Sequence, residues 1–117
     1  MVISKQLGFK DQFDFLNTHL QVINVFLPVK LTPKEIEVVA SFMSLDGTIS
    51  EDRFGTTARK MVRKRLKLSP GGLGNYLRTL KEKGFIGEKD NQQQFLPLLY
   101  PAGEEQLYQF KLKLIKG

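Results

Sequence analysis

Four stretches of the chain carry apolar residues at the three- and four-residue spacing of an amphipathic helix. The first is Phe9–Leu27, and Pro28 is expected to end it. Its apolar surface exceeds what one small core uses, so this helix either packs beneath the rest of the domain or also forms a dimer interface. The β-branched residues at 22, 23 and 25 leave a strand as a further alternative for this part.

The second stretch, Leu31–Met43, has the clearest helix start in the chain. Thr32 is the predicted N-cap, Pro33 the first helical residue and Glu35 the capping-box partner. The residues expected to face the core are Ile36, Val39, Ala40 and Met43. Residues 45–51 contain an Asp-Gly pair and are predicted to form a surface loop.

The third and fourth stretches are predicted to form a helix-turn-helix. Between Arg53 and Lys67 the predicted inward face comprises Ala58, Met61, Val62 and Leu66. The fourth helix is expected to start with Ser69 as N-cap and Pro70 as its first residue, and to stop at Gly84. Its predicted inward face comprises Leu73, Tyr76, Leu77 and Leu80. In the alternative interpretation, residues 70–72 are loop and the helix begins near Leu73.

After Gly84 the apolar period changes from 3.6 to 2, which predicts strands. A first strand begins at Phe85, residues 90–94 form a polar tip, and residues 95–100 return as an edge or bulged strand because Pro97 lies in them. A final strand is predicted where apolar and polar residues alternate: Tyr108, Phe110, Leu112 and Leu114 against Gln109, Lys111 and Lys113.

The 117 residues suffice for one domain, and the net charge of +6 is unevenly distributed. From Arg53 to Lys89 there are eleven basic and two acidic residues, whereas the rest of the chain has seven basic and ten acidic ones. Such a basic patch indicates nucleic acid as the partner, with an acidic protein or an anionic membrane surface as alternatives.

Several classes of site are excluded by composition. The chain has no cysteine and one histidine, His19, which excludes disulfides, thiol nucleophiles, cysteine zinc sites and a histidine metal cluster. His19 is expected on a polar or half-buried helix position. A phosphate-binding glycine loop, a zinc-protease motif and a nucleophile elbow are all missing, so we expect no enzyme, no cofactor and no metal. The acidic pairs at 51–52 and 104–105 are expected to be solvated charges.

The outward face of the fourth helix is the predicted DNA-reading surface, because asparagine can pair with adenine and arginine with guanine in a major groove. We expect bases to be read by Asn75, Arg78 and Thr79. The residues expected to bind phosphates are Arg59, Lys60, Arg63, Lys64, Lys67, Ser69, Gly71 and Gly72.

The order of these elements resembles a winged helix-turn-helix domain over residues 31–100, and the most specific segment is Lys67–Ile86. That segment is similar to the turn, recognition helix and wing entry of MarR-type regulators and of replication or phage DNA-binding proteins. The resemblance implies a wing at residues 85–99. Serine or threonine is common in the family at the positions of Gly71 and Gly72, and arginine is usual near the wing tip, which here is polar and neutral to acidic.

We therefore expect one α+β domain: an N-terminal helix in residues 1–30, a helical core in 31–84, and a β-wing with a C-terminal strand in 85–117. The expected function is binding of double-stranded DNA without chemistry, in transcription or replication. A homodimer through the N-terminal helix is one expectation. The alternative is a protein-interaction or virion-assembly component whose basic face binds an acidic partner or nucleic acid without sequence preference. The chain has neither a secretory signal nor a membrane span, so we expect it in the cytoplasm of a bacterial or phage-infected cell.

Overall fold

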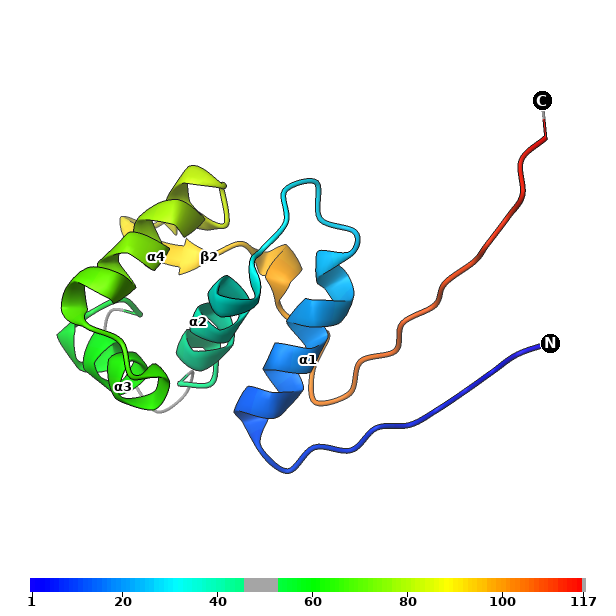
Figure 1. Ribbon diagram of the computed structural model, residues 1–117, viewed down its shortest axis with the longest axis horizontal. Coiled ribbons are helices and arrows are strands. Elements are labelled where there is room, and N and C mark those ends of the chain that lie inside the picture. Colours follow the sequence, from blue (N-terminus) through cyan, green and yellow to red (C-terminus); the bar gives the residue numbers. More distant parts are fainter. Residues whose placement is uncertain (46–52, 117) are drawn as a thin grey trace.

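The computed structural model describes residues 1–45 and 53–116, and it has an α+β fold compatible with a winged-helix layout. Its elements are α1 (Gln12–Asn24), α2 (Pro33–Met43), α3 (Thr56–Leu66), α4 (Pro70–Glu82), β1 (Ile86–Lys89), β2 (Gln92–Phe95) and the 3-10 turn η1 (Pro97–Leu99) (Figure 1). Most of the predicted loop at 45–51 and the acidic pair at 51–52 lie outside the described residues.

Helix α2 is the centre of the fold, with α1 on one side and α3 and α4 on the other (Figure 1). Its predicted start is confirmed, because the Thr32 hydroxyl accepts from the Glu35 N–H and the Glu35 carboxylate accepts from the Thr32 N–H. Eight of its eleven residues are buried. A helix buried on nearly all sides must be surrounded by other elements, and this is why the domain is organised around α2.

Helix α1 is shorter than the predicted Phe9–Leu27. Asp11 caps its N-terminus by accepting from the Phe13 N–H, so Phe9 lies before the helix. At the other end the side-chain amide of Asn24 bonds both the N–H and the C=O of Leu31, at 2.8 and 3.0 Å. These two bonds close the loop after the helix, so α1 ends four residues before Pro28. The strand alternative for this part is wrong.

Helices α3 and α4 are joined by the three residues 67–69, as in a helix-turn-helix. Lys67 ends α3 in the left-handed conformation, with φ 56°. Ala58 and Val62 face the core as predicted, whereas Met61 is 44% exposed and does not. Ser69 caps α4 and accepts from the Gly72 N–H at 3.0 Å, so α4 starts at Pro70 and the later start near Leu73 is wrong.

Gly84 stops the fourth helix as predicted, since its φ of 84° suits a residue without a side chain. The chain then forms the antiparallel pair β1–β2, in which Ile86 faces Phe95 and Lys89 faces Gln92. Asp90 and Asn91 both have positive φ and make a two-residue turn. The predicted tip at 90–94 was therefore too long, and the return strand ends where it was predicted to begin, at Phe95.

The predicted final strand at 108–114 is wrong. Residues 105–116 are extended but pair with no strand, and β1–β2 is the one sheet among the residues that the structure describes. An alternating pattern needs a neighbouring strand before a ladder can form. Instead, both ends of the chain run away from the helices on the same side of the molecule (Figure 1).

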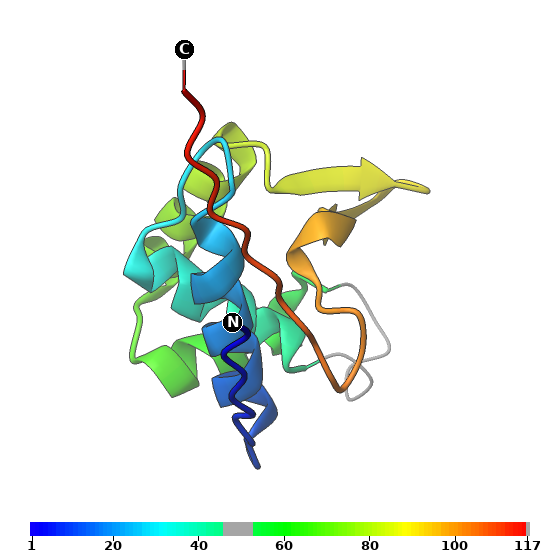
Figure 2. The same ribbon diagram turned by 90° about the vertical axis from the view of Figure 1, so that its right-hand side faces the viewer.

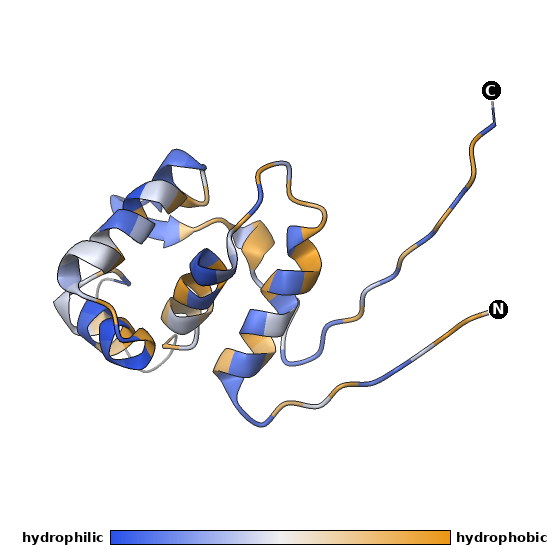
Figure 3. Ribbon diagram, viewed as in Figure 1, coloured by the Kyte–Doolittle hydropathy of each residue, from blue (hydrophilic) through white to orange (hydrophobic). Residues whose placement is uncertain are grey.

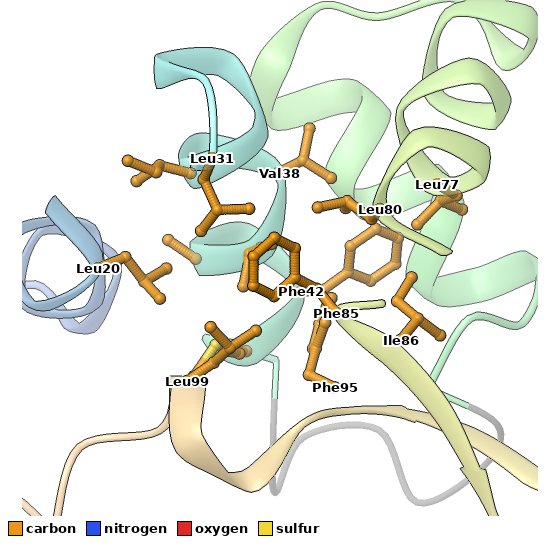
Figure 4. Close-up of a cluster of buried hydrophobic side chains, with 14 of the residues drawn as sticks. Leu20, Leu31, Val38, Phe42, Leu77, Leu80, Phe85, Ile86, Phe95 and Leu99 are labelled. Carbon is orange, nitrogen blue, oxygen red and sulfur yellow. The ribbon is translucent and has the colours of Figure 1, made fainter. Parts of the chain in front are cut away.

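The core is closed by aromatic rings from distant parts of the chain. Phe42 of α2 lies edge-on to Phe54 and Phe95, with centroid distances of 5.1 and 6.3 Å, and Phe54 and Phe95 are 5.1 Å apart. Side chains from α1, α2, α4, the hairpin and η1 point into the same cluster (Figure 4). The helices show the matching stripes of apolar residues toward the centre (Figure 3). The small hairpin is thus anchored to the helices by Phe95.

His19 is buried, at 3% exposed, whereas a polar-face or half-buried helix position was predicted for it. Its Nε2 bonds the carbonyl of Leu99 and its Nδ1 bonds the hydroxyl of Tyr108, residues 80 and 89 positions away. Burial lowers the pKa of His19 from its ordinary value, and the bond to Leu99 opposes this in part. The neutral imidazole therefore holds η1 and the start of the C-terminal segment against α1.

The lowered pKa of His19 predicts that the protein loses stability in mild acid. The unfolded chain binds the proton first, near pH 6.5, so stability is full above that pH and falls as pH drops toward the folded-state pKa. Urea unfolding should give a free energy lower by up to about 1 kcal/mol at pH 5.5 than at pH 7.5. His19 is the one histidine of the chain, so His19→Gln should abolish the difference. An unchanged pH dependence in this variant would contradict the assignment.

A buried ion pair joins the two ends of the helical core. Lys83 Nζ lies 2.6 Å from Glu35 Oε1 and 3.0 Å from the carbonyl of Lys30. The carboxylate side chain is 2% exposed and the ammonium side chain 22% exposed. Lys83 thus connects the end of α4 to the start of α2 and to the loop before it.

Lys83→Ala should destabilise the protein by about 3 kcal/mol, because it leaves the Glu35 carboxylate buried without its cation. The matched control is Lys34→Ala, which removes an exposed pair with Glu37 and should cost less than about 1 kcal/mol. Urea unfolding measures both variants. If they lose the same free energy of unfolding, the buried Lys83–Glu35 pair stabilises the protein no more than the exposed pair.

Candidate nucleic-acid interface

The outer face of α4 presents a continuous exposed stripe formed by Gly71, Asn75, Arg78 and Glu82. Their spacing of four, three and four residues places them on one side of the helix. Arg78 Nε lies 3.9 Å from Glu82 Oε1, and both side chains are about two-thirds exposed, so this pair leaves the guanidinium available. The predicted base-reading residues Asn75 and Arg78 therefore lie together and face outward.

Thr79, the third predicted base-reading residue, lies beside this stripe and is half-buried. Its hydroxyl donates to the carbonyl of Asn75 at 2.9 Å, within the same helix. The hydroxyl keeps its acceptor lone pairs, but its donor is used. Thr79 is thus a weaker candidate for reading bases than Asn75 or Arg78.

The start of α4 offers one backbone donor to an anion. Pro70 has no N–H, and the N–H of Gly72 is taken by Ser69, which leaves the N–H of Gly71 in the first turn. Gly71 is exposed, and a side chain there would meet nothing within 4 Å. Of the three predicted phosphate-binding residues in this turn, Gly71 can donate its N–H directly, whereas the N–H of Gly72 is used by Ser69. The Ser69 hydroxyl accepts in that bond and keeps its own hydrogen as a donor.

Two arginines from α3 flank this first turn. Arg59 and Arg63, with Thr56, Pro70 and Leu73, line a cavity of about 150 Å³ between α3 and the start of α4. Arg59 Nε donates to the carbonyl of Phe54 at 2.6 Å, which orients its guanidinium and leaves the terminal nitrogens for a ligand. Two guanidinium groups beside a helix N-terminus form a favourable site for a phosphate oxygen.

The remaining basic residues fall into two groups. Lys60, Lys64 and Lys67 are exposed on α3 and in the turn, as expected of phosphate-binding side chains. Arg65 points to α1 instead, where it pairs with Asp11 at 3.2 Å and lies 4.2 Å above the Phe13 ring. Arg53 lies over the rings of Phe95 and Tyr100, at 5.9 and 5.7 Å. Arg53 and Arg65 thus serve the packing of the domain.

The β1–β2 hairpin projects from the body with its tip in solvent (Figure 2). Its exposed residues are Glu88, Lys89, Asp90, Asn91 and Gln92. The two carboxylates and one ammonium give the tip no positive charge, so it is suited to polar contacts more than to neutralising phosphates.

Sequence reasoning missed two parts of this surface. Thr56 was not selected, although its place at the first turn of α3 puts it opposite the start of α4. The contacts of Arg65 with Phe13 and Asp11 were also missed, since these residues lie 52 and 54 positions before Arg65 in the chain. The exposed Asp11 N-cap gave no local signal of that pairing.

No family model, no curated protein and no solved structure matches this chain. Within residues 1–45 and 53–116, no three histidine, cysteine or acidic side chains lie close enough to hold a metal ion. None of the helices in this described part combines the length and the apolar character needed to cross a membrane.

The glycines of α4 differ in what a methyl group would meet, and this predicts opposite effects. At Gly74 a new Cβ has nothing within 4 Å, so Gly74→Ala should stabilise the protein by up to about 1 kcal/mol by favouring the helix. At Gly72 the Cβ would lie 3.1 Å from Ser69 Oγ, which caps the helix, so Gly72→Ala should gain little or lose stability. Thermal unfolding of both variants checks this, and a larger gain for Gly72→Ala would contradict it.

Proposed function

We propose that this protein binds double-stranded DNA through α4 and the basic side of α3, as a regulator of transcription or replication without enzymatic activity. The observation that carries the proposal is the exposed stripe of α4 with Asn75 and Arg78 at its centre, flanked by exposed lysines. A helix with this outer face fits a major groove, and the short connection to α3 is typical of helix-turn-helix proteins.

In this arrangement, contacts to phosphates and contacts to bases are made by different residues. Arg59, Arg63 and the N–H of Gly71 bind a phosphate at the start of α4, and Lys60, Lys64 and Lys67 neutralise neighbouring phosphates. Asn75 and Arg78 read base edges. The projecting hairpin lies at the far end of α4, where it can reach the flanking groove with polar side chains (Figure 2).

A second candidate function is that of an assembly component whose basic face binds nucleic acid without sequence preference or an acidic partner. Apolar side chains are exposed on the N-terminal arm, residues 1–10, and on the C-terminal arm, residues 107–116, and they favour this function because such surfaces normally contact protein. The two functions differ in one respect: an assembly component binds all duplex sequences equally.

Fluorescence anisotropy with labelled random duplex DNA should show log K falling linearly with log salt, with a slope of about −4 to −6 for five to seven phosphates. Lys64→Ala should flatten the slope by about one and weaken all sequences alike. The matched control is Lys5→Ala, which removes an exposed lysine from the N-terminal arm and should leave the slope unchanged. No binding at low salt would overturn the proposal.

After selection of a preferred site, Arg78→Ala should cost about 1 to 3 kcal/mol on that site and much less on random DNA. Equal losses on every sequence would remove its base-reading role. A failure to select any preferred sequence, with the salt slope intact, would favour the assembly component.

A further inference from the structure

The C-terminal arm, residues 107–116, is an extended segment with apolar side chains in water. Its start contacts α1 and the residues that follow it, since Tyr108 bonds His19 of α1 and the Phe110 ring stacks on Phe26, two residues after the helix, at a centroid distance of 5.4 Å. Beyond this point Leu112 and Leu114 are 99% and 81% exposed. Figure 3 shows the alternation of apolar and polar residues along the arm.

The backbone of the arm is also without a strand partner. The β1–β2 pair is the one ladder in the described part of the chain, so neither edge of the arm is paired with a described strand. A segment with period-two apolar residues and unpaired edges is a template for pairing with a second strand. A second copy of this chain can supply that strand.

The sequence of the arm is complementary to itself in one antiparallel register. With Phe110 opposite Phe110 of a second copy, Tyr108 lies opposite Leu112, and Gln109 lies opposite Lys111. A register centred on Lys111 or on Leu112 instead places lysines directly opposite each other, which is destabilising. A register centred on Gln109 places Gln109 opposite itself and leaves Leu112 opposite Gln106, whereas the register centred on Phe110 keeps Leu112 opposite Tyr108 and has this mismatch only farther out, where Leu114 lies opposite Gln106.

The charges next to the arm favour the same register. Glu104 and Glu105 precede the arm, whereas its own charges are all positive. With Phe110 at the centre, Glu104 of one copy lies opposite Lys116 of the other, and Glu105 is diagonal to Lys113. A parallel pair in register would place lysine beside lysine.

We propose that the C-terminal arms of two copies pair as an intermolecular antiparallel β-ribbon centred on Phe110, which joins them as a twofold dimer. The apolar face of the ribbon covers the exposed apolar residues that follow α1, which are Val25, Phe26 and Val29. This differs from direct pairing of the N-terminal helices. The arm leaves the body on the side away from α3 and α4 (Figure 1), so the inference is independent of what the basic face binds.

Single cysteines placed along residues 106–116 of the full chain test the register, because the natural chain has none. Under mild oxidation, Phe110→Cys should form covalent dimers fastest, since the twofold axis places it opposite itself. Leu114→Cys should form few, because its two copies are eight residues apart along the ribbon, about 27 Å. A flat profile, or a maximum at another position, overturns the proposal.

A mixture of Gln109→Cys and Lys111→Cys chains tests the register with Phe110 intact. The mixture should give several-fold more covalent dimer than either variant alone, since these two positions face each other. Equal yields from the mixture and the single variants overturn the register.

Sedimentation equilibrium tests the dimer itself. The natural chain should approach twice its 13.4 kDa mass with rising concentration. Leu112→Asp should weaken association at least tenfold, whereas Leu98→Asp, at an exposed leucine of η1, should not. A monomer at all concentrations overturns the proposal. Loss of the dimer on deleting residues 2–8, with no effect of Leu112→Asp, overturns it in favour of the N-terminal arm. The salt dependence of DNA binding by Leu112→Asp is measured separately. An unchanged slope in a variant that no longer dimerises shows that DNA binding does not depend on the arm, so the two proposals can fail independently.

Discussion

The buried ion pair between Lys83 and Glu35 links the end of α4 to the start of α2, beside the core contacts that α4 makes through Leu73, Leu77 and Leu80. The Glu35 carboxylate has two tasks, since it completes the capping box of α2 and receives the ammonium from the end of α4. The same ammonium bonds the carbonyl of Lys30 in the loop after α1. Two of these bonds, both made by Lys83, therefore fasten the end of α4 to the start of α2 and to the loop after α1. They help to fix the direction of the outer face of α4. A binding surface on a helix is accurate only when the helix itself is positioned in this way.

The aromatic core also fixes the hairpin and the turn before α3 to α2. Phe54 precedes α3 and Phe95 ends β2, and both pack on Phe42 of α2. Arg53 lies over Phe95 and Tyr100, so a charge from the basic segment stabilises packing. Within the basic segment, Arg53 and Arg65 thus pack on aromatic rings, whereas Lys60, Lys64 and Lys67 face solvent.

The molecule separates its surfaces. The basic side of α3, the outer stripe of α4 and the hairpin lie at one end, while both arms and the exposed end of α1 lie at the other (Figure 1). His19 and Tyr108 hold the base of the C-terminal arm against α1, so the arm leaves the body in a defined direction. The surface proposed to bind DNA and the surface proposed to pair two copies are therefore separate parts of the molecule.

Local signals in the sequence predicted the helical part well. The capping box at Thr32, the Ser69–Pro70 start and the Gly84 stop are all confirmed, because each depends on residues within one turn of helix. The outward direction of Asn75 and Arg78 followed from the same periodicity. None of these findings tests the ligand, and duplex DNA stays a proposal drawn from charge and shape.

The tertiary structure alone decided the features that join distant residues. Burial of His19 depends on Leu99 and Tyr108, and the removal of Arg65 from the basic face depends on Asp11 and Phe13. The strand predicted from the period-two pattern at 108–114 does not form, since a ladder needs a neighbouring strand and the described residues offer none there. Sequence by itself determined the starts of α2 and α4 and the stop at Gly84, because those bonds are local. It misjudged both ends of α1. It could not determine which polar or extended groups find partners, because those partners lie tens of residues away.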